Sequence, residues 1–196
     1  MSAGRRIPWS EARDIAERIS IELRPHVGRL KCVGSVRRKK ATVADIEFVA
    51  EPHYDVGLFG ERTPITDPAK AAMMRIGRWV KGATRMMVIS DVFGHQGLRC
   101  ELFLVHEPAT WGAICAIRTG PADLGQYVVT HSKRLNRIRV EGGRAIHMDT
   151  GEQVPTDTEE QFFALANVPL VTPSKRDAQI IALANDLNRY SQGAGA

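Results

Sequence analysis

The order of the predicted helices and strands is the feature that most constrains the fold. Apolar residues at helical spacing predict a first helix that begins at Ser10, a residue able to cap it, and ends before Pro25. Short strands are expected at residues 29–33 and 44–50, where apolar and polar side chains alternate. In the second strand, this alternation places polar and apolar residues on opposite faces of a sheet.

A second helix and a further pair of strands follow. A cap-then-proline signature predicts a helix that begins at Asp67 and continues through Val80. Residues 85–92 and 97–105 are strand-like, and the four residues between them resemble a hairpin turn. Strand pairs mixed with helices, without a regular strand–helix–strand rhythm, predict an α+β fold with a mixed or mainly antiparallel sheet.

The character of the chain changes after residue 108, so we expect two units, residues 1–108 and residues 109–196. The second unit is predicted to be a small α+β lobe with less strand content. Its expected elements are a short apolar segment, a helix, a small hairpin and two further helices: residues 111–117, 122–135, 137–155, 159–166 and 178–190.

Composition limits the class of protein. Hydrophobic residues make up 43% of the chain and charged residues 25%, which is typical of a folded globular protein. No apolar run reaches the roughly 18 residues that a membrane span needs, and the polar start lacks the apolar stretch of a signal peptide. The three cysteines have no zinc-ligand spacing. We therefore expect a cytoplasmic protein with reduced cysteines and no membrane partner, and we expect a monomer.

The charge pattern points to a polyanionic partner. The formal net charge is +5, and the whole excess lies in residues 1–108. The second half still contains a basic stretch that we expect to contact DNA: Lys133, Arg134, Arg137 and Arg139. The alternative is that these side chains form ion pairs with Glu141 or with the acidic region 157–160 and only stabilise the lobe.

Two carboxylates follow a glycine-containing turn. Nine residues separate the Gly34-Ser35 pair from Asp45, and Glu47 lies two residues further on, on the same strand face. If the strand that carries Glu101 is a neighbour with its face aligned, three carboxylates converge. Such a cluster suits two Mg²⁺ ions roughly 3.5–4 Å apart, as in phosphoryl transfer. The alternative for an Asp-x-Glu pair alone is a solvated strand face.

The residues beside this turn suit a phosphate ligand. Gly34 allows the backbone to approach a phosphate closely, and Ser35 is able to donate a hydrogen bond to it. Arg37 and Arg38 would add charge-assisted contacts to a triphosphate.

Residues 33–49, VGSVRRKKATVADIEFV, resemble the palm signature of the family X DNA polymerases, the polymerase beta-like nucleotidyltransferases. The resemblance continues on both sides of this segment. Residues 6–8 match an Arg-Ile-Pro segment, and residues 98–105 resemble the strand with the family's third carboxylate. Residues 111–120 and 159–177 resemble the start and the closing segment of the family's thumb lobe. The chain thus resembles the family in a reduced form, with a nucleotidyltransferase palm (1–108) and a thumb (109–196).

The resemblance implies roles for the acidic residues. Asp45, Glu47 and Glu101 would be catalytic and would hold two Mg²⁺ ions, with Mn²⁺ as the alternative metal. Glu101, supported by Arg99, would accept the proton of the primer 3′-hydroxyl. The family usually has Asp at the third position, so Glu101 moves that carboxylate about one methylene further out.

The resemblance also implies a nucleotide-binding set. Arg6 would reach the terminal phosphate, and a Thr-Gly turn would lie against the sugar. The matching positions are Gly34, Ser35, Arg38, Arg6, Thr119 and Gly120. The aromatic pair usual before the Thr-Gly turn is replaced by Ile117 and Arg118, which affects the expected choice of sugar.

The function implied by these residues is a metal-dependent DNA polymerase that adds deoxynucleotides to a primer 3′-end, filling gaps in DNA repair. Its partners would be primer-template or gapped DNA and deoxynucleoside triphosphates. Two alternatives stay open. One is a template-independent nucleotidyltransferase acting on RNA, protein or a small molecule, and the other is a non-catalytic nucleic-acid binding relict.

Overall fold

The computed structural model describes residues 6–193, with side chains through residue 184, so the outermost residues of the two expected units lie outside the description. The fold is α+β, as the sequence predicts. The elements of the N-terminal lobe, residues 6–105, are β1 (Ile7–Pro8), α1 (Trp9–Leu23), β2 (Val27–Cys32), α2 (Gly34–Arg37), β3 (Thr42–Val43), β4 (Asp45–Val56), β5 (Arg62–Ile65), α3 (Asp67–Ile76), β6 (Arg78–Ala83), β7 (Met86–Ser90) and β8 (Arg99–Leu104).

A mixed sheet forms the centre of this lobe. Its strand order is β2-β4-β8-β7-β6, and β5 pairs with the far end of β4. The neighbours β4 and β8 run parallel, whereas the other pairs are antiparallel. The central parallel pair therefore joins two segments that lie about fifty residues apart in the chain.

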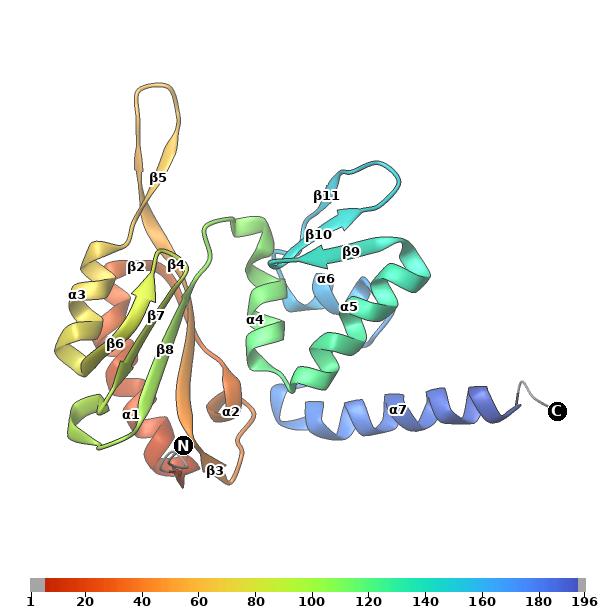
Figure 1. Ribbon diagram of the computed structural model, residues 1–196, viewed down its shortest axis with the longest axis horizontal. Helices are drawn as coiled ribbons and strands as arrows, with labels where there is room; N and C mark the ends of the chain where they lie inside the picture. The colour runs from red at the N-terminus through yellow and green to blue at the C-terminus, as the bar shows by residue number, and fades with distance from the viewer. Residues whose placement is uncertain (1–5, 194–196) are drawn as a thin grey trace.

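The two faces of the sheet have different coverings, as Figure 1 shows. Helices α1 and α3 cover one face, and the core there includes Ile46 and Phe48 of β4 with Cys100 and Leu102 of β8. On the opposite face, one end is covered by α4 (Trp111–Thr119). The alternation expected for residues 44–50 is confirmed in β4, and β8 alternates in the same way, so that the polar residues of both strands lie on the side of α4.

The C-terminal lobe, residues 108–193, packs around a core of its own. A three-stranded antiparallel sheet lies beside its helices (Figure 1). Its elements after α4 are α5 (Ala122–Asn136), β9 (Ile138–Glu141), β10 (Arg144–His147), β11 (Gln153–Val154), α6 (Glu159–Ala164) and α7 (Arg176–Gly193). In the described part of the chain, no helix is both long and apolar enough to cross a membrane.

Three local expectations were wrong. The second helix ends at Ile76, because Gly77 adopts extended backbone and Val80 lies in β6. Ser10 lies inside α1, which begins at Trp9 after Pro8, and does not cap it. The strand of residues 44–50 continues to Val56 and forms an unpredicted hairpin with β5, although Gly57 and Gly60 lie in the turn that connects the two strands.

Candidate active site

The parallel pairing of β4 and β8 brings the three predicted carboxylates together. In the register, Glu47 lies opposite Glu101 and Asp45 lies opposite Arg99. Because side chains alternate along a strand, Asp45, Glu47 and Glu101 share one face of the sheet. All three are partly buried.

Burial and the neighbouring negative charges both disfavour a charged Glu47 in this cluster. Burial, followed by the negative charges of Asp45 and Glu101, raises the pKa of Glu47 from 4.5 to about 7, although Arg118 and Arg38 oppose the shift. A divalent cation would reverse this effect by favouring the charged carboxylate, and carboxylate oxygens are the ligands that Mg²⁺ prefers. The donor chemistry of the three acids therefore fits a divalent metal.

The side chains are not arranged as a finished metal centre. Among the described residues, no group of three or more His, Cys, Asp or Glu side chains is positioned to hold a metal ion. Glu101 instead accepts a hydrogen bond from Arg99 Nη2 at 3.3 Å. Arg99 therefore contacts the carboxylate that it was predicted to support, and the supporting role itself stays a prediction.

The turn before the acids approaches them closely. Gly34 has φ +64°, a conformation that favours glycine, and a Cβ on it would overlap the Glu47 carboxylate. Gly34 thus lets α2 lie directly against β4. The predicted glycine turn and the predicted Asp-x-Glu pair are in contact.

A cavity of about 500 Å³, which we call the Ser35 cavity, opens beside Asp45. Ser35 lines it, and its Oγ is buried and has no hydrogen-bond partner in the described structure. The cations that line the cavity are Arg6, Arg38 and Lys40. A hydroxyl donor, three cations and a carboxylate therefore surround one space.

The two arginines after Ser35 contact the Thr-Gly turn at the end of α4. Arg37 Nη1 donates to Thr119 Oγ1 at 2.6 Å, and Arg38 Nη1 donates to the Thr119 carbonyl. Gly120 has φ +70°, and a Cβ there would lie 2.7 Å from Arg38 Nη1. Thr119 and Gly120 are therefore near the Ser35 cavity, but in this conformation they contact protein groups.

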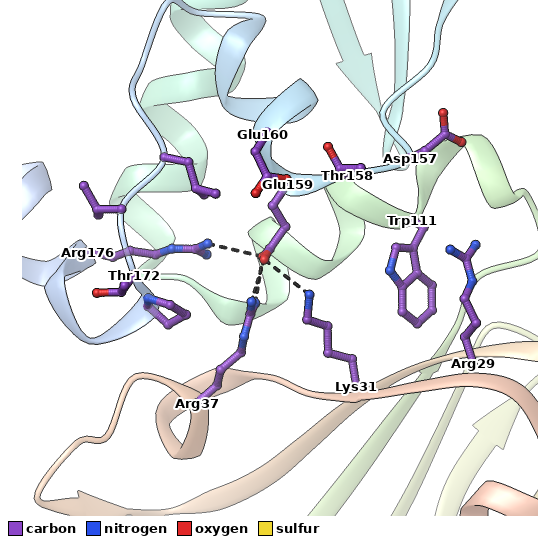
Figure 2. Close-up of a pocket in the computed structure, with 13 residues that line it drawn as sticks. Arg29, Lys31, Arg37, Trp111, Asp157, Thr158, Glu159, Glu160, Thr172 and Arg176 are labelled. Carbon is purple, nitrogen blue, oxygen red and sulfur yellow. Dashed lines mark hydrogen bonds and ion pairs between the residues drawn. The ribbon is translucent and has the colours of Figure 1, made fainter.

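A second pocket, of about 560 Å³, lies between the two lobes and is shown in Figure 2. Glu159 of α6 accepts two hydrogen bonds from Arg37, at 2.6 and 2.7 Å, and also pairs with Lys31 and Arg176. Burial would raise the pKa of Glu159, but Arg37, Arg176 and Lys31 outweigh it and lower that pKa to about 2. This network connects the N-terminal lobe to the closing segment of the chain.

The predicted DNA-binding stretch is divided by the structure. Arg137 pairs with Asp149 at 2.7 Å, and Arg139 pairs with Glu141 at 3.2 Å. Lys133 and Arg134 lie on the last turn of α5, and neither forms an ion pair with any side chain that the structure describes. The stretch therefore contains two arginines that are already neutralised and two cations that are available to a ligand.

Three residues of this region had no site role in the sequence-based prediction. Lys40 lines the Ser35 cavity, and the signal was its position at the end of the basic run 37–40. The positive charge of Arg118 acts to lower the pKa of Glu47, and its guanidinium lies 3.6 Å from the centre of the Phe103 ring, next to the Thr-Gly turn. No local pattern identified Glu159, because two of its partners, Lys31 and Arg37, lie 128 and 122 residues before it and the third, Arg176, lies 17 residues after it.

No family model matches the chain, and no curated protein is similar enough to match it.

Proposed function

We propose that the chain is a metal-dependent nucleotidyltransferase with the palm-type fold, which transfers deoxynucleotides to a DNA primer 3′-hydroxyl. One observation carries the proposal. Glu47 and Glu101 face each other on adjacent parallel strands, Asp45 lies on the same face, and the Ser35 cavity opens beside Asp45. An acidic cluster next to a cationic cavity is the pairing that transfer from a polyphosphate requires.

The cavity would hold the triphosphate. Ser35 Oγ, which lacks a partner, donates a hydrogen bond to a phosphate oxygen, and Arg6 and Arg38 offset the phosphate charge. Thr119 and Gly120, at the end of α4, contact Arg38, which lines this space, and would lie against the sugar. These contacts position the α-phosphorus close to the acidic face of the sheet.

Asp45, Glu47 and Glu101 would hold Mg²⁺ or Mn²⁺, which when bound supplies charge neutralisation for the transferred phosphoryl group. Glu101 accepts the proton of the 3′-hydroxyl, and the hydroxyl oxygen then bonds to the α-phosphorus as pyrophosphate leaves. Arg99 orients the Glu101 carboxylate through their hydrogen bond. Gap filling during DNA repair is the biological role that we propose for this reaction.

A second candidate is a template-independent nucleotidyltransferase with a smaller acceptor. The ion pairs of Arg137 and Arg139 favour it, because they reduce the positive charge that a duplex would contact. A non-catalytic nucleic-acid binding protein is the third reading, and it predicts no transfer at all.

Extension of a labelled primer tests the proposed polymerase function and its need for a template. The assay uses each nucleotide in turn, Mg²⁺ or Mn²⁺, and a primer with and without template. Asp45→Ala is expected to lower turnover by at least about 100-fold while the fold is kept, because removing one electrostatic catalytic group costs that much. Asp55→Ala, at an exposed position of the same strand, is the matched control. Retention of most of the turnover by Asp45→Ala would refute the assignment of the acids.

A further inference from the structure

Two cations of the Ser35 cavity are already paired with an acid from the other lobe. Asp177, in the first turn of α7, lies with Oδ1 3.1 Å from Lys40 Nζ and Oδ2 3.6 Å from Arg38 Nε. Arg38 and Lys40 both line the cavity. One carboxylate therefore bridges both cations.

A carboxylate bridging two cations uses the same kind of contact that a phosphate would use. Arginine and lysine form charge-assisted hydrogen bonds with either anion, so a phosphate that reaches Arg38 and Lys40 competes with Asp177, which lies 3.1 Å from Lys40 Nζ but forms no hydrogen bond with Arg38 Nε. The cavity also holds an independent sign of a ligand, because Ser35 Oγ is buried and has no partner among the described residues. Asp177 thus neutralises part of the site without filling it.

The exposure of the pair argues against a purely structural role. The Lys40 side chain is 45% exposed and that of Asp177 is 36% exposed, so this pair is open to water, whereas the Arg38 side chain is only 15% exposed. Ion pairs this open to water contribute little to folding, because both charges remain solvated. Such an ion pair has a larger effect on the affinity for a charged ligand that binds next to it.

We propose that Lys40 is a polyphosphate-binding residue and that Asp177 competes with the polyphosphate for Lys40 and Arg38. This inference rests on the proposed function, because it assigns the Ser35 cavity to phosphates. Asp177 weakens the binding of every ligand that needs both cations. The affinity of the free enzyme for nucleotide is therefore set partly by a residue of α7, which lies in the other lobe.

Binding of inorganic tripolyphosphate to the full chain tests the inference by calorimetry, with and without Mg²⁺. Asp177→Asn is expected to tighten binding by about two- to five-fold, the size expected for removing one partly exposed ion pair. Lys40→Gln is expected to weaken it by a similar factor. In the double variant, the gain from Asp177→Asn is expected to shrink, because one of the two cations for which Asp177 competes is gone.

Two matched controls separate competition from a general change of charge. Asp123→Asn removes the same charge from the first turn of α5, where Asp123 is exposed. Lys39→Gln removes a cation next to Lys40 that does not line the cavity. Both controls are expected to bind tripolyphosphate as the wild type does, and circular dichroism checks that every variant is folded.

The outcomes distinguish the two levels of the proposal. The proposed competition by Asp177 is refuted if Asp177→Asn leaves tripolyphosphate binding unchanged or weakens it. It is also refuted if Asp123→Asn tightens binding by the same factor as Asp177→Asn. Binding that is unchanged in Lys40→Gln would overturn the role of Lys40. In these cases the nucleotide site itself would stand. Folded protein that binds no tripolyphosphate in any form would instead overturn the proposed function together with the inference.

Discussion

The raised pKa of Glu47 makes the stability of the metal-free protein depend on pH. In the folded chain the pKa is about 7, against an ordinary value of 4.5. As pH rises, the unfolded chain loses the Glu47 proton near pH 4.5, and the folded chain loses it only near pH 7. The stability contributed by protonated Glu47 is therefore present below about pH 4.5 and is lost as pH rises through about 7. Holding the charged carboxylate in the fold then costs about 3 kcal/mol above that pH.

Glu47→Gln removes this cost, because the amide is neutral at every pH and has nearly the same shape. The variant is expected to be about 3 kcal/mol more stable than the wild type at pH 8, with a difference near zero at pH 4.5. Guanidinium unfolding followed by tryptophan fluorescence, in EDTA at several pH values, measures the free energy of unfolding. Glu22→Gln, at an exposed position of α1, is the control and is expected to show no such trend.

Magnesium extends the same test. If the acids hold a divalent cation, adding Mg²⁺ at pH 8 raises the stability of the wild type by favouring charged Glu47, and raises that of Glu47→Gln much less. A stability gain for Glu47→Gln that is equal at pH 5 and pH 8 would refute the reasoning, because the gain would then not come from ionisation. No gain at pH 8 would refute it as well.

Three further predictions follow from the same structure. Glu159→Gln is expected to lower the free energy of unfolding by about 3–5 kcal/mol at pH 7, since it leaves buried cations uncompensated. Because the pKa of Glu159 is about 2 in the folded wild type, the stabilisation by this residue is present above about pH 4.5 and is lost as pH falls through about 2. Acid titration of the wild type, followed by circular dichroism, checks this loss. Gly34→Ala is expected to abolish primer extension and to destabilise the chain by at least about 1 kcal/mol, because φ is +64° and the new methyl group meets the Glu47 carboxylate; wild-type melting and activity would contradict it. If Lys133 and Arg134 contact phosphates, neutralising both is expected to reduce the slope of log DNA affinity against log salt by about two units, and an unchanged slope in a salt titration would remove them from the interface.

Local patterns in the sequence were enough to predict the elements that carry the site. Alternation along residues 44–50 correctly placed Asp45 with Glu47 on one strand face, because the side-chain period of a strand is a property of the backbone alone. The helical spacing of apolar residues in α1 is also a local pattern, and it predicted this helix in the same way. The wrong helix end at Val80 shows the limit of this reasoning, since the helical pattern continued past the point where Gly77 leaves the helix.

Only the tertiary structure decided which of these faces meet. That β4 and β8 are parallel neighbours with Glu47 opposite Glu101 depends on the pairing of distant segments, which no local period encodes. The pairing of Arg137 with Asp149, the network around Glu159 and the bridge from Asp177 to Lys40 are likewise contacts between remote residues. The sequence around a charged side chain does not identify its ion-pair partner, because ion pairing depends on distance in space. That distance is set by how the segments pack in the tertiary structure.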